Sequence, residues 1–342
     1  MAGLFPIGTK WCGAPGAPLL IAEEGQANQG NLELALRMIA LAAEAGADGI
    51  EFQLAMADDL YVRADPGHAL YQPRQFNEQQ IKTLVDAAHA AGLFFQAACL
   101  SPRLYEICGH AGADVFTVNA MDLNNPLMLE TAAGSGRPFW LATLMGTLEE
   151  IEWAVNFVRP RAVAPFGLLH GQHIMSADPA ATVPAEMLQL DCIHLFQERY
   201  QVPVGFVDHT STTTVPALAV AKGAAAVCKH LIPEVGWRGP DWMVALPPDE
   251  WRRAGALARF AARAGGQSKD LSQAEVKDRS VQRRSLFSAQ ALPAGHALAA
   301  QDLVALRPGG GLDPRHMDAL LGRRLKTDVP AQHKLTAADL ED

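Results

Sequence analysis

The chain has 342 residues, of which 49% are hydrophobic, so its length and composition suit one large globular domain and a smaller one. Its formal net charge of −9, with no compensating basic run, argues against a nucleic-acid-binding surface. No run of about 18 apolar residues occurs, so we expect no membrane span.

The first residues lack the apolar core of a signal peptide, so export is not expected. The five cysteines are odd in number and form no Cys-x-x-Cys pair. Free thiols in a reducing compartment are the natural interpretation, which predicts a cytoplasmic protein.

Short apolar runs alternate with amphipathic segments along the first 266 residues. The apolar runs, read as strands, are 18–22, 48–53, 93–97, 114–118, 138–143, 164–170, 204–210 and 224–230. The clearest helical patterns are 31–45, 78–91, 147–158, 184–200 and 248–264. Eight strand-helix alternations predict a (β/α)8 TIM barrel, for which a doubly wound sheet is the alternative.

Polar residues follow most of these strands. In a barrel the carboxyl ends of the strands form the active-site face, so their side chains would meet at one mouth. This clustering indicates an enzyme. The polar strand-end residues are Glu23, Gln53, Gln96, Asn119, Asp122, Thr143, His170, Asp208, His209, Lys229 and His230.

Two of the strand ends carry histidines. His209 and His230 lie 21 residues apart, a length that suits one strand-helix-strand unit. On neighbouring barrel strands they would face the same mouth, where two imidazoles can bind a divalent metal. Two ordinary loop histidines are the alternative.

A polar segment at 267–284 separates the barrel from the C-terminal residues and is interpreted as a linker. Residues 285–342 predict a small β-rich module, which at this size is marginal alone and should dock on a partner surface. We see no internal repeat beyond the strand-helix alternation.

Several motifs, in the same order, resemble the sialic acid synthase family. They are Ile21-Ala-Glu-x-Gly25, Phe52-Gln53, Asp122-Leu-x-Asn125, Leu168-Leu-His170, Asp208-His-Thr210, Lys229-His230 and Gly239-Pro-Asp241. The C-terminal pieces Arg284-Ser, Arg307-Pro-Gly and Leu321-Gly-Arg resemble the SAF (antifreeze-like) domain that follows the barrel in these enzymes.

The resemblance implies condensation of phosphoenolpyruvate with an N-acyl amino sugar, using Mn²⁺ or Mg²⁺. It also implies a domain-swapped homodimer in which the SAF domain reaches the partner's barrel. His209 and His230 match the family's metal ligands. Glu23 and Asp241 match sugar contacts, and Arg307 matches the arginine that reaches the sugar from the partner subunit. A turn-forming Asp241 and a surface Arg307 are the structural alternatives.

The phosphoenolpyruvate contacts of the family are replaced here. Glu51 stands in place of a lysine, Thr117 and Ala120 replace a lysine and a serine, and Val207 replaces a serine. A phosphate and a carboxylate need cations and hydrogen-bond donors, so these changes together indicate a different ligand.

The remaining strand-end residues complete the predicted site. Asp122 stands where the family has a glutamate that can act in proton transfer, and Lys229 is the one evident cation left near the mouth. With Glu23 they form the predicted catalytic set. The predicted substrate-binding residues are Glu23, Glu51, Gln53, Thr117, Asn119, Thr143, His170, Asp241 and Arg307.

We therefore expect a divergent, metal-dependent enzyme that acts on a sugar-like substrate by carbon–carbon bond formation or cleavage, or a related addition or elimination. Its second reactant would not be phosphoenolpyruvate in the usual site. One alternative is a true N-acetylneuraminate synthase that binds phosphoenolpyruvate through altered residues. The other is a non-catalytic binding paralogue.

Overall fold

The structure is a computed structural model that describes residues 3–14, 16–174, 183–266 and 268–341. The chain forms two compact units, Met1–Gly265 and Gly266–Asp342. In the described ranges no helix is long and apolar enough to cross a membrane. All five cysteines lie in these ranges and are free, which confirms the prediction of free thiols.

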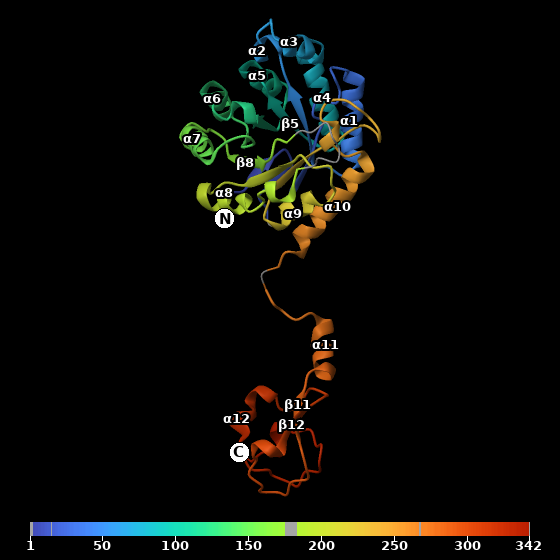
Figure 1. Ribbon diagram of the computed structural model, residues 1–342, viewed down its shortest axis with the longest axis vertical. Coiled ribbons are helices and arrows are strands. Elements are labelled where there is room, and N and C mark those ends of the chain that lie inside the picture. The colour runs from blue at the N-terminus through green and yellow to red at the C-terminus, as the bar shows by residue number, and fades with distance from the viewer. Residues whose placement is uncertain (1–2, 15, 175–182, 267, 342) are drawn as a thin grey trace. The chain divides into compact units, whose positions relative to one another are not determined.

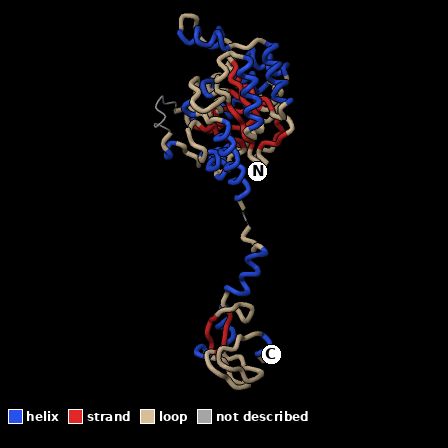
Figure 2. The backbone as a smooth tube through the Cα atoms, turned by 90° about the vertical axis from the view of Figure 1, so that its right-hand side faces the viewer, coloured by secondary structure: helices blue, strands red, loops and turns tan. Residues whose placement is uncertain are grey.

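Unit 1 is a closed barrel of eight parallel strands in the order β10-β3-β4-β5-β6-β7-β8-β9, which confirms the predicted (β/α)8 fold. The strands lie at the centre and the helices cover the outside (Figures 1 and 2). The barrel strands are β3 Leu19–Glu23, β4 Gly49–Leu54, β5 Phe94–Cys99, β6 Val115–Val118, β7 Phe139–Ala142, β8 Phe166–Gly171, β9 Val204–Asp208 and β10 Ala226–His230.

The helices of unit 1 begin with capping residues at several positions, such as Asn77 and Thr147, each of which forms a capping box. They are α1 Leu32–Glu44, α2 Ala57–Leu60, α3 Pro66–Tyr71, α4 Glu78–Ala90, α5 Pro102–Ala111, α6 Pro126–Gly134, α7 Leu148–Val158, α8 Cys192–Tyr200, α9 Val215–Ala221 and α10 Pro248–Ala264. The 3₁₀ turns are η1 Gln72–Arg74, η2 Ala120–Asp122, η3 Ala185–Met187 and η4 Trp242–Val244.

The helix expected over 184–200 is shorter than predicted. Only Cys192–Tyr200 is α-helical, and η3 stands before it. Gln189 between them has φ of +46°, a left-handed conformation that ends a helical run.

Alternate residues of each strand face the barrel interior. On β3, Leu19 and Ile21 belong to the interior cluster, whereas Leu20 and Ala22 pack in the layer between strands and helices. This alternation places Glu23, the last residue of β3, on the interior side.

An N-terminal hairpin, absent from the sequence prediction, closes the barrel at the amino ends of its strands. Its strands are β1 Phe5–Ile7 and β2 Lys10–Cys12. Phe5, Ile7 and Cys12 are buried in the interior cluster, and the Phe5 ring lies 5.7 Å from Trp140. The barrel therefore opens to solvent at the carboxyl ends of its strands.

Unit 2 contains α11 Gln273–Gln282, β11 Ser285–Ser288, β12 Leu303–Leu306 and α12 Met317–Leu320. The two strands pair antiparallel around a core that consists mainly of leucines. Helix α11 lies inside the segment expected to be a linker, and it buries none of its side chains within the described chain.

Unit 2 also contains an internal repeat that the sequence prediction missed. Residues 292–303, LPAGHALAAQDL, match 329–340, VPAQHKLTAADL. In both copies the histidine contacts the aspartate six residues later, at 2.7 Å from His296 to Asp302 and 3.1 Å from His333 to Asp339. Both aspartates end a 3₁₀ turn, η5 Ala300–Asp302 or η7 Ala337–Asp339. The prediction of no further repeat was therefore wrong.

Candidate active site

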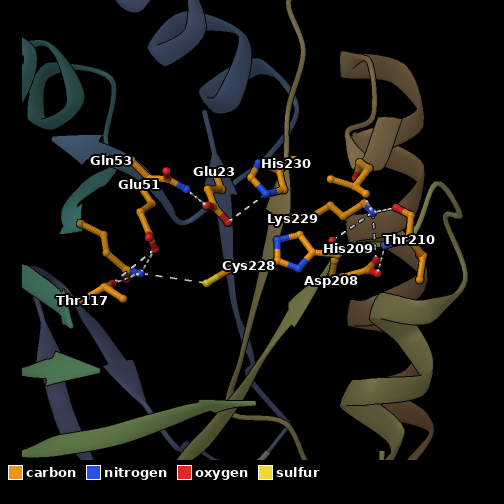
Figure 3. Close-up of polar contacts among 12 residues, drawn as sticks. Glu23, Glu51, Gln53, Thr117, Asp208, His209, Thr210, Cys228, Lys229 and His230 are labelled. Carbon is orange, nitrogen blue, oxygen red and sulfur yellow. Dashed lines mark hydrogen bonds and ion pairs between the residues drawn. The ribbon is translucent and has the colours of Figure 1, made fainter. Parts of the chain in front are cut away.

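The interior residues at the carboxyl ends of the strands form one polar group (Figure 3). Seven of these side chains are at most 8% exposed, and only Gln53 is half-buried. They are Glu23, Glu51, Gln53, Gln96, Thr117, His209, Cys228 and His230.

The two predicted metal histidines stack against each other. The ring centroids of His209 and His230 lie 5.2 Å apart with an interplanar angle of 25°. The backbone carbonyl of Gln172 accepts a hydrogen bond from His209 Nδ1 at 2.8 Å, which leaves Nε2 as the free ligand atom. The His173 ring meets the His209 ring edge-on at 5.6 Å.

Burial lowers the pKa of both His209 and His230 to about 4, and for His209 the neighbouring His230 adds to the effect. Both imidazoles are therefore neutral at pH 7, which is the form that binds metals.

Glu23 lies beside this pair. One of its carboxyl oxygens is 3.6 Å from His230 Nε2, and the other accepts a hydrogen bond from Gln53 Nε2 at 2.7 Å. Burial raises the pKa of Glu23, an effect that the proximity of His209 opposes. Gln53 thus fixes the orientation of the Glu23 carboxyl group.

Asp241 reaches the same region from the loop after β10. Gly25 packs against both groups, since a Cβ placed on it would lie 2.4 Å from His230 Nδ1 and 3.2 Å from Asp241 Oδ2. Burial raises the pKa of Asp241, and the proximity of His230 opposes that rise. The residues expected at the sugar end of the barrel, apart from Arg307, therefore lie together.

The histidine pair fits a divalent metal with an open coordination sphere. Two neutral imidazoles supply nitrogen donors, and His230 Nε2 is buried without a hydrogen-bond partner. Among the residues that the structure describes, no group of three or more His, Cys, Asp or Glu side chains has the geometry to hold a metal. Water or substrate would complete the coordination, as is typical of catalytic sites.

Part of this polar group forms a hydrogen-bonded network across the barrel interior from the histidines. Gln96 Nε2 donates a hydrogen bond to Glu51 Oε2 and another to Thr117 Oγ1 at 3.0 Å, and it lies 4.0 Å from Cys228 Sγ. Burial raises the pKa of Glu51 well above its usual range, and the nearby Glu23 adds to this effect. Burial therefore favours the protonated, neutral form of the Glu51 carboxyl group.

Lys229 points away from this interior. Its ammonium group pairs with Asp208 at 3.1 Å and donates to the backbone carbonyls of Asp208, Thr210 and Val244. Burial lowers the pKa of Lys229, and Asp208 opposes that shift. A residue next to the inward-facing His230 on the same strand must face outward, so this geometry does not favour the predicted catalytic role.

Four other predicted residues lie at the rim or on the outer side of the barrel wall. Asn119 Oδ1 caps η2, and Asp122 accepts a hydrogen bond from Asn125 at 2.9 Å, while burial raises the Asp122 pKa. The Thr143 hydroxyl donates to the Leu169 carbonyl at 3.3 Å. His170 contacts the Gln189 carbonyl at 3.2 Å and lies among aromatic rings outside the barrel. The fifth, Arg307, is an exposed residue of unit 2.

Sequence reasoning missed Arg74, which η1 brings to the loop after β3, where it donates to Gln26 at 3.1 Å. No local pattern marks a single arginine in a loop. The place of Gln96 in the interior network was implied by its spacing of two residues from the inward-facing Phe94.

The fold and the site define a barrel enzyme whose mouth carries a histidine pair and sugar-compatible carboxylates. Residues 38–270 match the model of the NeuB family, and residues 283–341 match that of the SAF domain. The chain belongs to the NeuB family and carries a SAF domain; it is a carbohydrate-biosynthesis enzyme of the sialic acid synthase group, whose members form carbon–carbon bonds.

Similar proteins span nearly the whole chain. The N,N'-diacetyllegionaminic acid synthase of Legionella pneumophila is 27% identical over 95% of both chains. Human N-acetylneuraminate-9-phosphate synthase is 26% identical over 94% of this chain and 92% of its own. The crystal structure of the N-acetylneuraminic acid synthetase of Leptospira borgpetersenii, in complex with citrate, superposes with a TM-score of 0.74 at 25% identity, covering 81% of this chain and 95% of that one.

Proposed function

We propose that this protein is a divergent, metal-dependent member of the NeuB family that acts on a sugar-like substrate. The reaction is aldol-type carbon–carbon bond formation or cleavage, or a related addition or elimination. Its second reactant is not phosphoenolpyruvate held in the family's usual site. The observation that carries this proposal is the buried, hydrogen-bonded Glu51–Gln96–Thr117 network beside the stacked pair of His209 and His230.

At the sugar end, the arrangement of four residues supports such a substrate. Glu23, fixed by Gln53, and Asp241 offer carboxyl oxygens to sugar hydroxyl groups. His209 and His230 would hold a divalent ion, Mn²⁺ or Mg²⁺, which when bound polarises a substrate carbonyl group. Asp122 at the rim would exchange a proton, and its raised pKa supports that role.

The other side of the interior supports a changed second reactant. A phosphate or carboxylate needs cations or several donors. Here the strand residues offer a carboxylic acid, a hydroxyl and an amide that already bond to one another. If Glu51 ionised beside a bound phosphate, the two charges would repel each other in a site of low dielectric constant. A neutral, non-phosphorylated reactant is therefore favoured.

An aldol addition between these two reactants requires no additional oxidant, reductant or leaving group. The second reactant loses a proton from the carbon next to its carbonyl group, that carbon bonds to the aldehyde carbon of the sugar, and the aldehyde oxygen gains a proton. Lys229 is left out of this scheme, because its contacts with Asp208 and three carbonyls give it a structural role.

The same proposal includes a domain-swapped homodimer in the cytoplasm, in which residues 267–284 link the barrel to the SAF domain and Arg307 reaches the partner's sugar site. The names of the relatives favour an N-acyl amino sugar as the substrate.

The test incubates the full-length protein and Mn²⁺ with N-acetylmannosamine and one second reactant: phosphoenolpyruvate, pyruvate or dihydroxyacetone. Products are followed by mass spectrometry and phosphate release. We expect a new carbon–carbon product with dihydroxyacetone, the neutral reactant, and no phosphate release. Turnover of pyruvate would contradict the preference for a neutral reactant. Turnover of phosphoenolpyruvate would instead support a true synthase. No product from any reactant, together with unchanged metal binding by a His209→Ala/His230→Ala variant, would support a non-catalytic paralogue.

A further inference from the structure

Arg74 is an arginine with unused donors near the proposed sugar site. It ends η1, in the loop between β4 and α4, and is half-buried. One of its terminal nitrogens donates to Gln26 Oε1 at 3.1 Å, and its guanidinium lies 5.4 Å from the centre of the Tyr71 ring. An arginine has five N–H donors, so most of them are left for another partner.

The backbone around Arg74 is fixed by close packing. Gly30, in the loop after β3, lies so near that a Cβ on it would be 2.0 Å from the Pro73 carbonyl oxygen and 2.9 Å from Arg74 Cα. On the other side of η1, Gln75 Oε1 accepts a hydrogen bond from the Ala57 amide at 2.9 Å. Contacts with Gly30 and Ala57 on either side therefore fix the position of the backbone at Arg74.

The partner of Arg74 connects it to the site. Gln26 is buried, with φ of +58°, and directly follows Gly25, which packs against His230 and Asp241. The Gln26 side chain that accepts the Arg74 hydrogen bond therefore lies one residue from the backbone that packs against His230 and Asp241.

No acidic partner explains this arginine. Within the described residues, Arg74 forms no ion pair with any carboxylate, in contrast to Arg63 on the same loop, which pairs with Asp58 at 3.0 Å. Lys229, the other cation near the mouth, is fully engaged by Asp208 and backbone carbonyls. A half-buried guanidinium with free donors is suited to a planar or tetrahedral oxyanion.

We infer that Arg74 is a substrate-binding residue that recognises an oxyanion on the sugar-like substrate, either a carboxylate or a phosphate. The inference rests on the proposed function, because it requires that a sugar binds beside Asp241 and Glu23. It adds that the sugar is charged, and that a loop, rather than a strand end, supplies the cation.

The experiment measures binding to the full-length protein with Mn²⁺ by isothermal titration calorimetry. The probes are neutral N-acetylmannosamine, its 6-phosphate, and N-acetylmannosaminuronic acid. The variants are Arg74→Ala, Arg74→Lys and the control Arg63→Ala, which removes the same charge from the same loop. Thermal unfolding of each variant verifies that it folds.

We expect one charged sugar to bind at least about tenfold more tightly than the neutral sugar, as a charge-assisted contact provides. Arg74→Ala should abolish this preference and change neutral-sugar affinity by no more than about twofold, while Arg63→Ala preserves the preference. Arg74→Lys should retain part of the preference for the charged sugar, since lysine keeps the positive charge but lacks the planar guanidinium group. The charged probe that shows the preference identifies the anion as phosphate or carboxylate.

Equal weakening of all three sugars by Arg74→Ala, or a preference that survives the substitution, overturns the inference. A separate outcome is that the neutral sugar binds, that its affinity falls in an Asp241→Asn variant, and that no charged sugar binds more tightly than it does. In that case the role of Arg74 fails while the proposed function stands. If the wild-type protein binds none of the three sugars, both fail.

Discussion

The backbone of Gly25 lies directly against the imidazole of His230. A Cβ at this position would be 2.4 Å from Nδ1 and 2.7 Å from Cε1, closer than real contacts allow. Gly25 also has φ of +51°, a left-handed conformation. The glycine is therefore required both by the backbone conformation and by the close approach of the His230 imidazole.

Gly25→Ala should weaken Mn²⁺ binding, because the added methyl group displaces His230. The matched control is Gly46→Ala: Gly46 has φ of +85° but no atom within 4 Å of its Cβ position. Both substitutions carry a conformational cost of about 1–2 kcal/mol. Titration calorimetry should show reduced metal affinity only for Gly25→Ala, and equal affinities in the two variants would contradict this interpretation.

Replacing both histidines by alanine should abolish Mn²⁺ binding, whereas His89→Ala should not, because His89 is an exposed residue on α4 that pairs with Asp114. Since the pKa of each site histidine is about 4, metal affinity should be flat above about pH 6 and fall as protons compete at lower pH. A steep loss of affinity between pH 8 and 6 would show that the imidazoles are not neutral there.

Glu51→Gln should alter the pH dependence of stability. The folded-state pKa of Glu51 is raised, so the native protein keeps a proton that the unfolded chain loses above about pH 4.3. The wild-type free energy of unfolding therefore falls as pH rises towards the folded-state pKa, by up to about 1.4 kcal/mol per pH unit, and the variant lacks this slope.

Urea denaturation at several pH values, followed by tryptophan fluorescence, checks this prediction. All six tryptophans lie in unit 1, so the signal reports the barrel. Glu33→Gln, which changes an exposed carboxylate on α1, is the control and should run parallel to wild type. If the Glu51→Gln curve is also parallel, Glu51 is ionised in the folded protein.

Lys229→Met should lower the free energy of unfolding by about 3–5 kcal/mol, because it leaves the buried Asp208 carboxylate without its cation. The exposed pair of Lys222 and Asp191 gives the control, and Lys222→Met should change stability by no more than about 0.5 kcal/mol. Adding Asp208→Asn to Lys229→Met should recover part of the loss. A stable but inactive Lys229→Met enzyme would restore the catalytic interpretation.

The barrel and the placement of the two histidines at neighbouring strand ends were predictable from the sequence, because both depend on local patterns. Apolar runs that end in polar residues define the strands, and the spacing of His209 and His230 places them on neighbouring strand ends. The orientation of Lys229 was also implicit, since it alternates with His230 along β10.

Features that depend on tertiary packing were not predictable in this way. The raised pKa of Glu51 follows from its burial beside Glu23, which only the closed barrel creates. Arg74 reaches the site because η1 packs against Gly30, about 44 residues away in sequence, and no local signal encodes that contact.

The two halves of unit 2 are related by more than sequence. Leu292 and Val329, the first residues of the two matching segments, pair antiparallel with each other, as the contact across a twofold axis requires. Gly295 and Gln332 occupy equivalent positions and share a left-handed backbone, with φ of +77° and +58°. The two matching segments also supply core side chains at equivalent positions, Leu292, Leu298 and Leu303 in one and Val329, Leu335 and Leu340 in the other. The core of unit 2 is therefore built largely from two equivalent sets of side chains, and a substitution in one set has a matched control in the other.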